Sequence, residues 1–256
     1  MTKFTKIALT VALTAGITAV SDAQVSYTGG VYSENFDSMA LTTTYGATGW
    51  TGIATGSGST LAPIVGTGSS ATGGVYNFGS VAVPGDRALG SVASGTTVAA
   101  FGAVFTNNSG FTLTSLNLAF IAEQWRSGDS NTANEAWTFQ LQPGATAITN
   151  AAFSSPLTQL SLNINEILTS TTAAAAVDGN AAPNRIAISD VITGLSIAPG
   201  ATFAIRWVDL NDAGADAGMA IDDFSLSAVP EPSVYMLLGV GILLCGQRFL
   251  RRSKSA

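Results

Sequence analysis

The stretch TLTSLNLAFIA, residues Thr112–Ala122, decides the fold, because apolar side chains fall at every second position along most of it. A period of two places these side chains on one face of a β-strand, where they can enter a core. Similar runs recur at Phe101–Thr106, Trp137–Leu141, Arg185–Ile188 and Thr202–Val208. No stretch of the body shows the spacing of an amphipathic helix, so the sequence predicts an all-β domain.

Short turn sequences separate these runs and predict antiparallel pairing. Three of them combine Gly with Asn or Pro: Asn107–Gly110, Gln142–Gly144 and Ala198–Gly200. Several short strands joined by such turns are typical of an antiparallel β-sandwich, and we expect a jelly roll. Residues 46–74 are rich in Gly, Ser and Thr and are expected to form long loops between edge strands, while residues 173–176 suit an alanine-rich loop or a short helix.

Residues Met1–Ala23 have the three parts of a secretory signal peptide. Lys3 and Lys6 form the basic start, residues 7–20 are apolar, and residues 21–23 form a small-x-small cleavage site. A buried N-terminal helix is the alternative, but the β-rich sequence that follows offers it no helical partner. We therefore expect a signal helix and export of the body.

The last stretch, VPEPSVYMLLGVGILLCGQRFLRRSKSA (229–256), is typical of a membrane-directed tail. Pro230 and Pro232 restrict the backbone around them to extended conformations. Residues 233–250 then predict a transmembrane helix of roughly 27 Å, at the short end for a bilayer core of about 30 Å. A basic cluster ends the chain: Arg248, Arg251, Arg252 and Lys254. By the positive-inside rule this cluster stays inside and the body lies outside.

The chain thus divides into a signal peptide (1–23), one β-sandwich domain (24–228) and the tail (229–256). The motif Val229, Pro230, Glu231 and Pro232, with the apolar segment and the basic cluster, resembles the PEP-CTERM sorting signal of Gram-negative bacteria. The resemblance implies export, transient membrane anchoring, recognition by an exosortase-type transpeptidase and frequent association with exopolysaccharide. The alternative is a membrane anchor that is never cut, which does not require the two prolines.

Charge and cysteine content limit the partners and the redox chemistry of the body. Between the two terminal segments it keeps four basic residues against fourteen acidic ones, a net charge of −10. Such a surface repels nucleic acid and anionic lipid, so we expect no nucleic-acid partner. Cys245, the single cysteine, lies in the tail, so the exported body has no disulfide and no thiol nucleophile.

The chain contains no histidine, which excludes Ser-His-Asp and Cys-His catalysis and metal sites with histidine ligands. Carboxylate chemistry remains. A glycan-active enzyme would use two acids, such as Glu123 with Asp209 or Asp222, about 5 Å apart for retention or about 6.5–9.5 Å apart for inversion of configuration.

Five oxygen-bearing side chains near the C-terminal end of the body suggest a calcium site: Asp209, Asn211, Asp212, Asp216 and Asp222. Carboxylates and an amide at alternate positions around a glycine turn can converge on one Ca²⁺. Their spacing does not fit an EF-hand. A solvated Asp/Asn turn leading into the last strand is the alternative.

Trp125 and Arg126 form a second candidate site, since a flat apolar ring beside a planar guanidinium suits a sugar or a carboxylate. The alternative is structural, with Glu123 paired to Arg126 or Arg87. With so few basic residues, we expect each arginine to pair with a carboxylate: Arg87 with Asp86 or Glu123, and Arg206 with Asp209 or Asp222. Trp50, Trp137 and Trp207 are expected to pack in the core or at its edge.

A second resemblance covers most of residues 34–227. The motifs Asp86–Ser91, Asn107–Gly110, Glu123–Arg126, Asp178–Asn180, Arg206–Asp209 and Ala220–Phe224 are similar to those of exported bacterial surface domains of unassigned activity. Members often carry a histidine where this chain has Ala217. The resemblance implies a jelly roll similar to lectins and carbohydrate-binding modules, without established catalytic residues.

These observations together predict a non-enzymatic, exported protein of the cell envelope or extracellular matrix, sorted by its tail. A glycan-binding module and a carboxylate-dependent glycan-active enzyme are the alternatives. An exposed Trp125 beside a shallow groove would favour the binding module.

Overall fold

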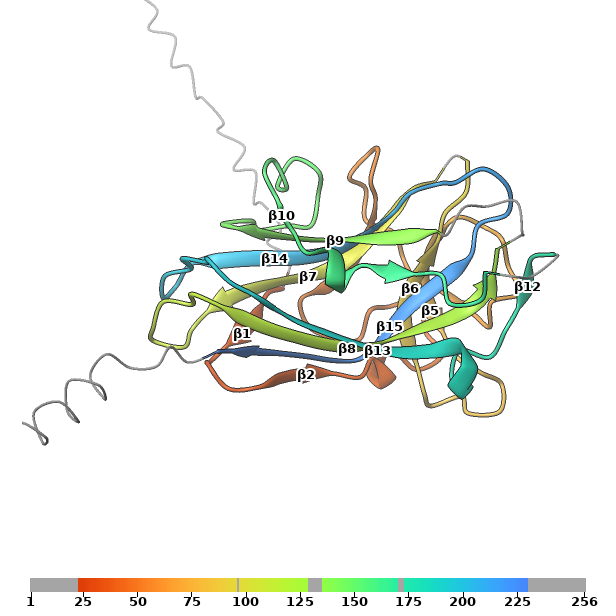
Figure 1. The fold of residues 1–256 in the computed structure, drawn as a ribbon, viewed down its shortest axis with the longest axis horizontal. Helices are drawn as coiled ribbons and strands as arrows, with labels where there is room; N and C mark the ends of the chain where they lie inside the picture. Colours follow the sequence, from red (N-terminus) through yellow and green to blue (C-terminus); the bar gives the residue numbers. More distant parts are fainter. Residues whose placement is uncertain (1–22, 96, 129–134, 170–172, 230–256) are drawn as a thin grey trace, which may run out of the picture.

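The computed structural model describes residues 23–95, 97–128, 135–169 and 173–229, which form two stacked β-sheets (Figure 1). Sheet A contains β1 (Val25–Tyr27), β3 (Trp50–Ala54), β7 (Ala99–Asn107), β9 (Ala136–Pro143), β10 (Leu157–Thr158), β11 (Ile164–Asn165) and β14 (Thr202–Asp209). Sheet B contains β2 (Tyr32–Glu34), β4 (Ile64–Gly66), β5 (Gly74–Phe78), β6 (Ala88–Val92), β8 (Leu116–Ser127), β12 (Ala175–Ala176), β13 (Arg185–Ile192) and β15 (Gly218–Ala228). Three short 3₁₀ turns connect them: η1 (Asp37–Met39), η2 (Leu160–Leu162) and η3 (Ala182–Asn184). The all-β prediction is confirmed for the described residues, in which no α-helix occurs.

The strand order is that of a jelly roll. From β6 onward the long strands alternate between the sheets, giving the order β6-β15-β8-β13 in sheet B and β7-β14-β9-β10 in sheet A. Two sets of four strands connected in this way are the jelly-roll arrangement, and the remaining strands extend the two sheets. Pairing is antiparallel except for β1 with β7 and β4 with β5, which are parallel.

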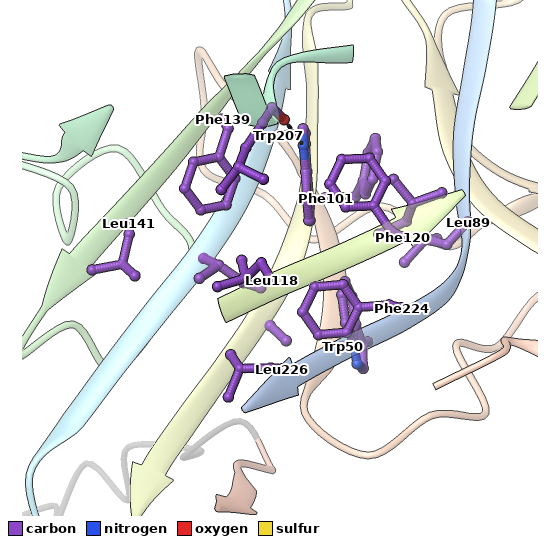
Figure 2. Packing of buried hydrophobic residues seen from close by; sticks show 14 of the residues in the cluster. Trp50, Leu89, Phe101, Leu118, Phe120, Phe139, Leu141, Trp207, Phe224 and Leu226 are labelled. Atoms are coloured by element: carbon purple, nitrogen blue, oxygen red, sulfur yellow. Dashed lines mark hydrogen bonds between the residues drawn. The ribbon is translucent and has the colours of Figure 1, made fainter. Parts of the chain in front are cut away.

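The main core fills the space between the sheets, and Trp207 of β14 is packed among its aromatic rings (Figure 2). Its ring centroid lies 5.8 Å from Phe101, 5.1 Å from Phe120 and 5.3 Å from Phe139. Its indole Nε1 donates a hydrogen bond of 3.0 Å to the carbonyl oxygen of Leu162, so the buried polar atom is satisfied. The prediction that Trp50, Trp137 and Trp207 pack in the core is confirmed, with exposures of 3, 0 and 0%.

The stretch that predicted the fold lies mostly in β8, the strand between β13 and β15. This strand begins at Leu116, where regular alternation starts, and continues past Ala122 to Ser127. Residues 46–74, expected to be loops, contain β3 and β4, because Ile53 and Ile64 each find an apolar cluster to pack against. Residues 175–176 form the short strand β12 rather than a helix or loop.

Both terminal predictions fall almost wholly outside the described residues. Residues 1–22, Pro230, Glu231, Pro232 and the basic cluster Arg248, Arg251, Arg252 and Lys254 all lie outside them. Val229 is described and is partly exposed at the end of sheet B. Within the part of the chain that is described, no helix has the length and apolar character needed to cross a bilayer.

Candidate functional site

Strands β8 and β15 bring Glu123 and Asp222 together on the outer face of sheet B, the face turned away from the main core. Glu123 pairs with Ala220, and Ile121 pairs with Asp222. Since alternate residues of a strand share a face, Glu123 and Asp222 are diagonal cross-strand neighbours. Both are buried, with exposures of 1 and 4%.

Burial raises the pKa of both acids, and the charge of Asp222 raises that of Glu123 further. The pKa of Glu123 rises to about 8, first through burial and then through the charge of Asp222, while Arg185 lowers it. Its Oε2 accepts a hydrogen bond of 3.2 Å from Trp125 Nε1, and its Oε1 lies 3.6 Å from Arg185 Nη2. Burial also raises the pKa of Asp222 to about 7, against the hydrogen bond that it accepts from the backbone N–H of Asp223. At neutral pH Glu123 is therefore mostly protonated.

A β-bulge in β15 turns the next acid toward solvent. The register with β8 shifts between Asp222 and Ser225, and Asp223 adopts a left-handed backbone with φ of 49°. Bulges commonly redirect a side chain in this way. The Asp223 side chain is 61% exposed, and its Oδ2 lies 3.9 Å from Arg185 Nη2.

Asp223 reaches a polar groove of about 510 Å³ between β2 and β15, lined by Ser33, Glu34, Asn35, Ser38, Asp223, Phe224 and Ser225. Glu34 Oε1 accepts a hydrogen bond from the backbone N–H of Phe36, which holds this carboxylate at the groove. Asn35 donates to Asp37 Oδ2 over 2.8 Å. We call this site the polar groove. Its carboxylates, amide and hydroxyls can accept and donate hydrogen bonds to a polar ligand.

Trp125 and Arg126 are buried, which favours the structural alternative over a stacking site. Trp125 is 1% exposed and stacks on Phe78, with ring centroids 5.9 Å apart. A Cβ at Gly179 would lie 2.3 Å from the Trp125 ring, so the 178–180 loop lies directly against the indole. Arg126 is also buried, and its Nη1 donates to the carbonyl oxygen of Gly68. This face of β8 is therefore covered by Phe78 and by the loops that contain Gly68 and Gly179.

The five residues expected to bind calcium are not gathered around one point. Asp209 is buried and accepts a 2.8 Å hydrogen bond from Ser91, while Asp222 faces Glu123. Asn211 Nδ2 donates to the carbonyl oxygen of Asp212, whose backbone N–H donates to Asp216 Oδ1. Across the described ranges no three acidic or cysteine side chains are placed to share a metal ion.

Two further buried acids extend this cluster: the charge of Glu135 acts on Asp209, and that of Glu166 acts on Glu135. The pKa of Glu135 is raised to about 8 by burial and by the charges of Asp216 and Glu166, against a hydrogen bond from the backbone N–H of Ala217. Glu166 Oε1 accepts hydrogen bonds from Gln124 and from the backbone of Gly128. The sequence analysis missed both glutamates, because each stands alone in the sequence, far from the Asp-rich stretch that they join in space.

The arginines also differ from the expectation that each pairs with a carboxylate. Arg87 binds Asn77 rather than Asp86 or Glu123. Arg206 donates to Gln140, Asn150 and the carbonyl oxygen of Ile148, and it stacks 4.1 Å above the Phe153 ring, so its partners are all uncharged. Arg185 is the residue that pairs with Glu123.

Burial of Glu123, Asp209 and Asp222 weakens the case for carboxylate catalysis. A glycosidase needs both carboxyl groups in contact with the sugar on either side of the scissile bond. Glu123 and Asp222 are closed off beneath Arg185 and the loops around them, and Asp209 faces Ser91. Glu34, Asn35 and Asp223, in contrast, line the open polar groove.

No protein-family model and no curated protein matches the sequence. Among solved structures, the CBM22-1 xylan-binding domain of Xyn10C from Paenibacillus barcinonensis is 12% identical, with a TM-score of 0.35, over 82% of this chain and 99% of that one. The xylan-binding module CBM15 is 14% identical, with a TM-score of 0.37, over 79% of this chain and 99% of the module. The K2 adhesin domain of Lys-gingipain is 10% identical, with a TM-score of 0.40, over 78% of this chain and 98% of the domain. TM-scores this low assign neither a ligand nor an activity to this chain.

Proposed function

We propose that the chain is an exported, non-catalytic protein of the cell envelope or extracellular matrix, and that its polar groove binds the hydroxyl groups of a polysaccharide. One observation carries the proposal: Glu34, Asn35 and Asp223 line an open groove, whereas the acids suited to catalysis are buried. Solvent-exposed hydrogen-bond donors and acceptors can bind a ligand, whereas buried acids cannot reach a bond to cleave it.

Hydrogen-bonding chemistry supports a polyhydroxylated ligand. Ionised carboxylates accept hydrogen bonds only, and sugar hydroxyls donate them, so Glu34 and Asp223 suit two neighbouring hydroxyls of a glycan. The serine hydroxyls of the groove can donate or accept.

Affinity electrophoresis of the protein in gels containing soluble xylan or polygalacturonate tests the groove. We expect at least one polymer to retard the protein, and Asp223→Asn and Asn35→Ala each to weaken binding about tenfold, the value of one hydrogen bond to a charged or amide group. Asp212→Asn, an exposed change in the turn after β14, is the matched control and should bind as the native protein does. Groove variants that bind as tightly as the control would contradict the proposal.

The cellular address is proposed from the ends of the chain. The signal peptide would direct export, and the Val229-Pro230-Glu231-Pro232 motif with its basic cluster would hold the protein in the membrane until an exosortase-type transpeptidase processes it. Expression with and without residues 229–256, followed by cell fractionation and mass measurement, tests this address. Equal secretion of both forms would rule out a sorting role for the tail.

A further inference from the structure

A second cavity, of about 330 Å³, lies against β4 and the segment that joins β5 to β6, and Arg87 is part of its wall. Three hydroxyl residues line it, Thr67, Ser69 and Ser80, together with the apolar side chains of Val65 and Val81. We call it the Arg87 pocket. Its volume is at the small end for ligand sites, the size for one small molecule or one unit of a polymer.

The Arg87 guanidinium is fixed in the wall by neutral partners. Arg87 is 2% exposed, its Nε donates to Asn77 Oδ1 over 2.7 Å, and its Nη2 donates to the Asn77 carbonyl oxygen over 2.6 Å. Asn77 is in turn held by the carbonyl oxygens of Ala40 and Thr42. The fork of donors is therefore positioned before any ligand arrives.

The third nitrogen of this guanidinium, Nη1, has no hydrogen-bond partner among the described residues. This atom lies beside Gly79, where a Cβ would come within 1.9 Å of it. Gly79 also lines the pocket. Because Gly79 has no side chain, Nη1 can lie against the Gly79 backbone, and both residues belong to the pocket wall.

The charge of Arg87 has no ion-pair partner within 4 Å among the described residues. Asp37 and Asp86 are the charged groups near it, and they partly offset the effect of burial, which lowers its pKa. Asp37 is already engaged, accepting hydrogen bonds from the Arg87 backbone N–H and from Asn35. A buried cation without a bonded anion is costly, so an incoming carboxylate would gain a strong, charge-assisted hydrogen bond.

The hydroxyl of Ser80 completes the donor set. Its Oγ accepts hydrogen bonds from the backbone N–H groups of Ala82 and Val83, which leaves its own proton free to donate. We propose that the Arg87 pocket binds the carboxylate of an acidic sugar unit, with Arg87 Nη1 and the Ser80 hydroxyl as donors and Val65 and Val81 against the C–H face of the sugar. This inference rests on the proposed polysaccharide function and names the charged unit that the polymer carries.

Titration calorimetry of the full chain with glucuronate, its methyl ester and glucose tests the pocket. The measurement is made in about 0.15 M salt, where screening over about 8 Å weakens repulsion by the acidic body. We expect glucuronate to bind at least tenfold more tightly than the ester or glucose. Equal binding of the acid and its ester would overturn the inference.

Two variants locate the binding site. Arg87→Gln removes the cation and should abolish the preference for the acid, and Ser69→Trp at the exposed rim should block the pocket without disturbing Asn77. Ser57→Trp, at an exposed position outside the pocket, is the control. If Arg87→Gln fails to fold, Ser69→Trp decides: unchanged glucuronate binding in that variant would refute the pocket.

The outcomes for the pocket and for the polar groove are separable. Retardation by a polymer that is lost with Asn35→Ala, but without any binding of glucuronate, keeps the proposed function and overturns the pocket. Glucuronate binding that is lost with Ser69→Trp, without retardation by either polymer, supports the pocket and overturns the polysaccharide function.

Discussion

Replacing Glu123 with Gln should stabilise the protein at alkaline pH and change its stability little at acidic pH. The side chain is 1% exposed, and its pKa rises from an ordinary 4.5 to about 8 in the folded protein. Because the folded-state pKa is the higher one, the folded state binds more protons between these two values. The stabilising contribution of the protonated acid is therefore complete below pH 4.5 and is lost as the pH rises through about 8.

The size of the effect follows from the same two values. The difference between the ordinary pKa of 4.5 and the folded-state pKa of about 8, at about 1.4 kcal/mol per pH unit, sets an upper limit of about 5 kcal/mol on the pH-dependent change in the free energy of unfolding. This upper limit already includes the repulsion by Asp222 and the attraction of Arg185. We therefore expect Glu123→Gln to be more stable than the native protein by about 2–4 kcal/mol at pH 9, and nearly equal to it at pH 5.

Urea unfolding of both proteins at pH 5, 6, 7, 8 and 9, followed by circular dichroism, measures this difference. Asp190→Asn is the control of opposite sign, because hydrogen bonds from Ser161 and Gln159 lower the pKa of Asp190. Its loss of stability should be present at neutral pH and vanish toward low pH. A Glu123→Gln difference that is constant across the series, or that favours the native protein at pH 9, would refute the proposed burial of an uncompensated acid.

Three other changes test packing. Trp207→Ala should lower the free energy of unfolding by about 3–5 kcal/mol in urea titrations, since it empties the centre of the core, whereas the exposed Leu210→Ala should change it by less than about 0.5 kcal/mol. Gly68→Ala should lower the thermal stability more than Gly200→Ala does. Both glycines have a positive φ, at which alanine costs about 1–2 kcal/mol. Only at Gly68 would the added Cβ also clash with a backbone oxygen, that of Trp125, at 1.7 Å. Arg206→Ala should lower the free energy of unfolding by about 2–4 kcal/mol, because one buried and two partly buried acceptors lose their donor. Equal effects within either pair, or no loss at Arg206, would contradict the packing described.

The fold was predictable from sequence because a strand that buries one face has apolar side chains at every second position. Thr112–Ala122 and Thr202–Val208 alternate clearly, since one face of β8 and of β14 enters the main core. The two strands within residues 46–74 were not predictable, because β3 and β4 are short and contain glycine. Nothing local in Trp50–Ala54 records that it pairs with β7, a strand almost fifty residues further along the chain.

The candidate site was predictable only where neighbours in sequence are neighbours in space. Glu123 and Asp222 were recognised as acids worth testing, but their pairing depends on the register between β8 and β15. The partners of Arg87 and Arg206 were missed for a related reason. Charge counting favours carboxylates, whereas packing placed the neutral oxygens of Asn77 and Ile148 within reach.

Burial of Trp125 explains why we propose ligand binding outside the aromatic centre of the outer face of sheet B. Tyr76, Phe78 and Trp125 form a continuous aromatic stack on the outer face, with centroid separations of 4.8 and 5.9 Å. Such a row would serve as a sugar platform if it were open. Gly68 and Gly179 instead let two loops close over it, because neither carries a Cβ that would strike Trp125. The stack therefore packs against the loops, and the two candidate ligand sites lie elsewhere: Asp223 lines the polar groove, and the hydroxyls of Thr67, Ser69 and Ser80 line the Arg87 pocket.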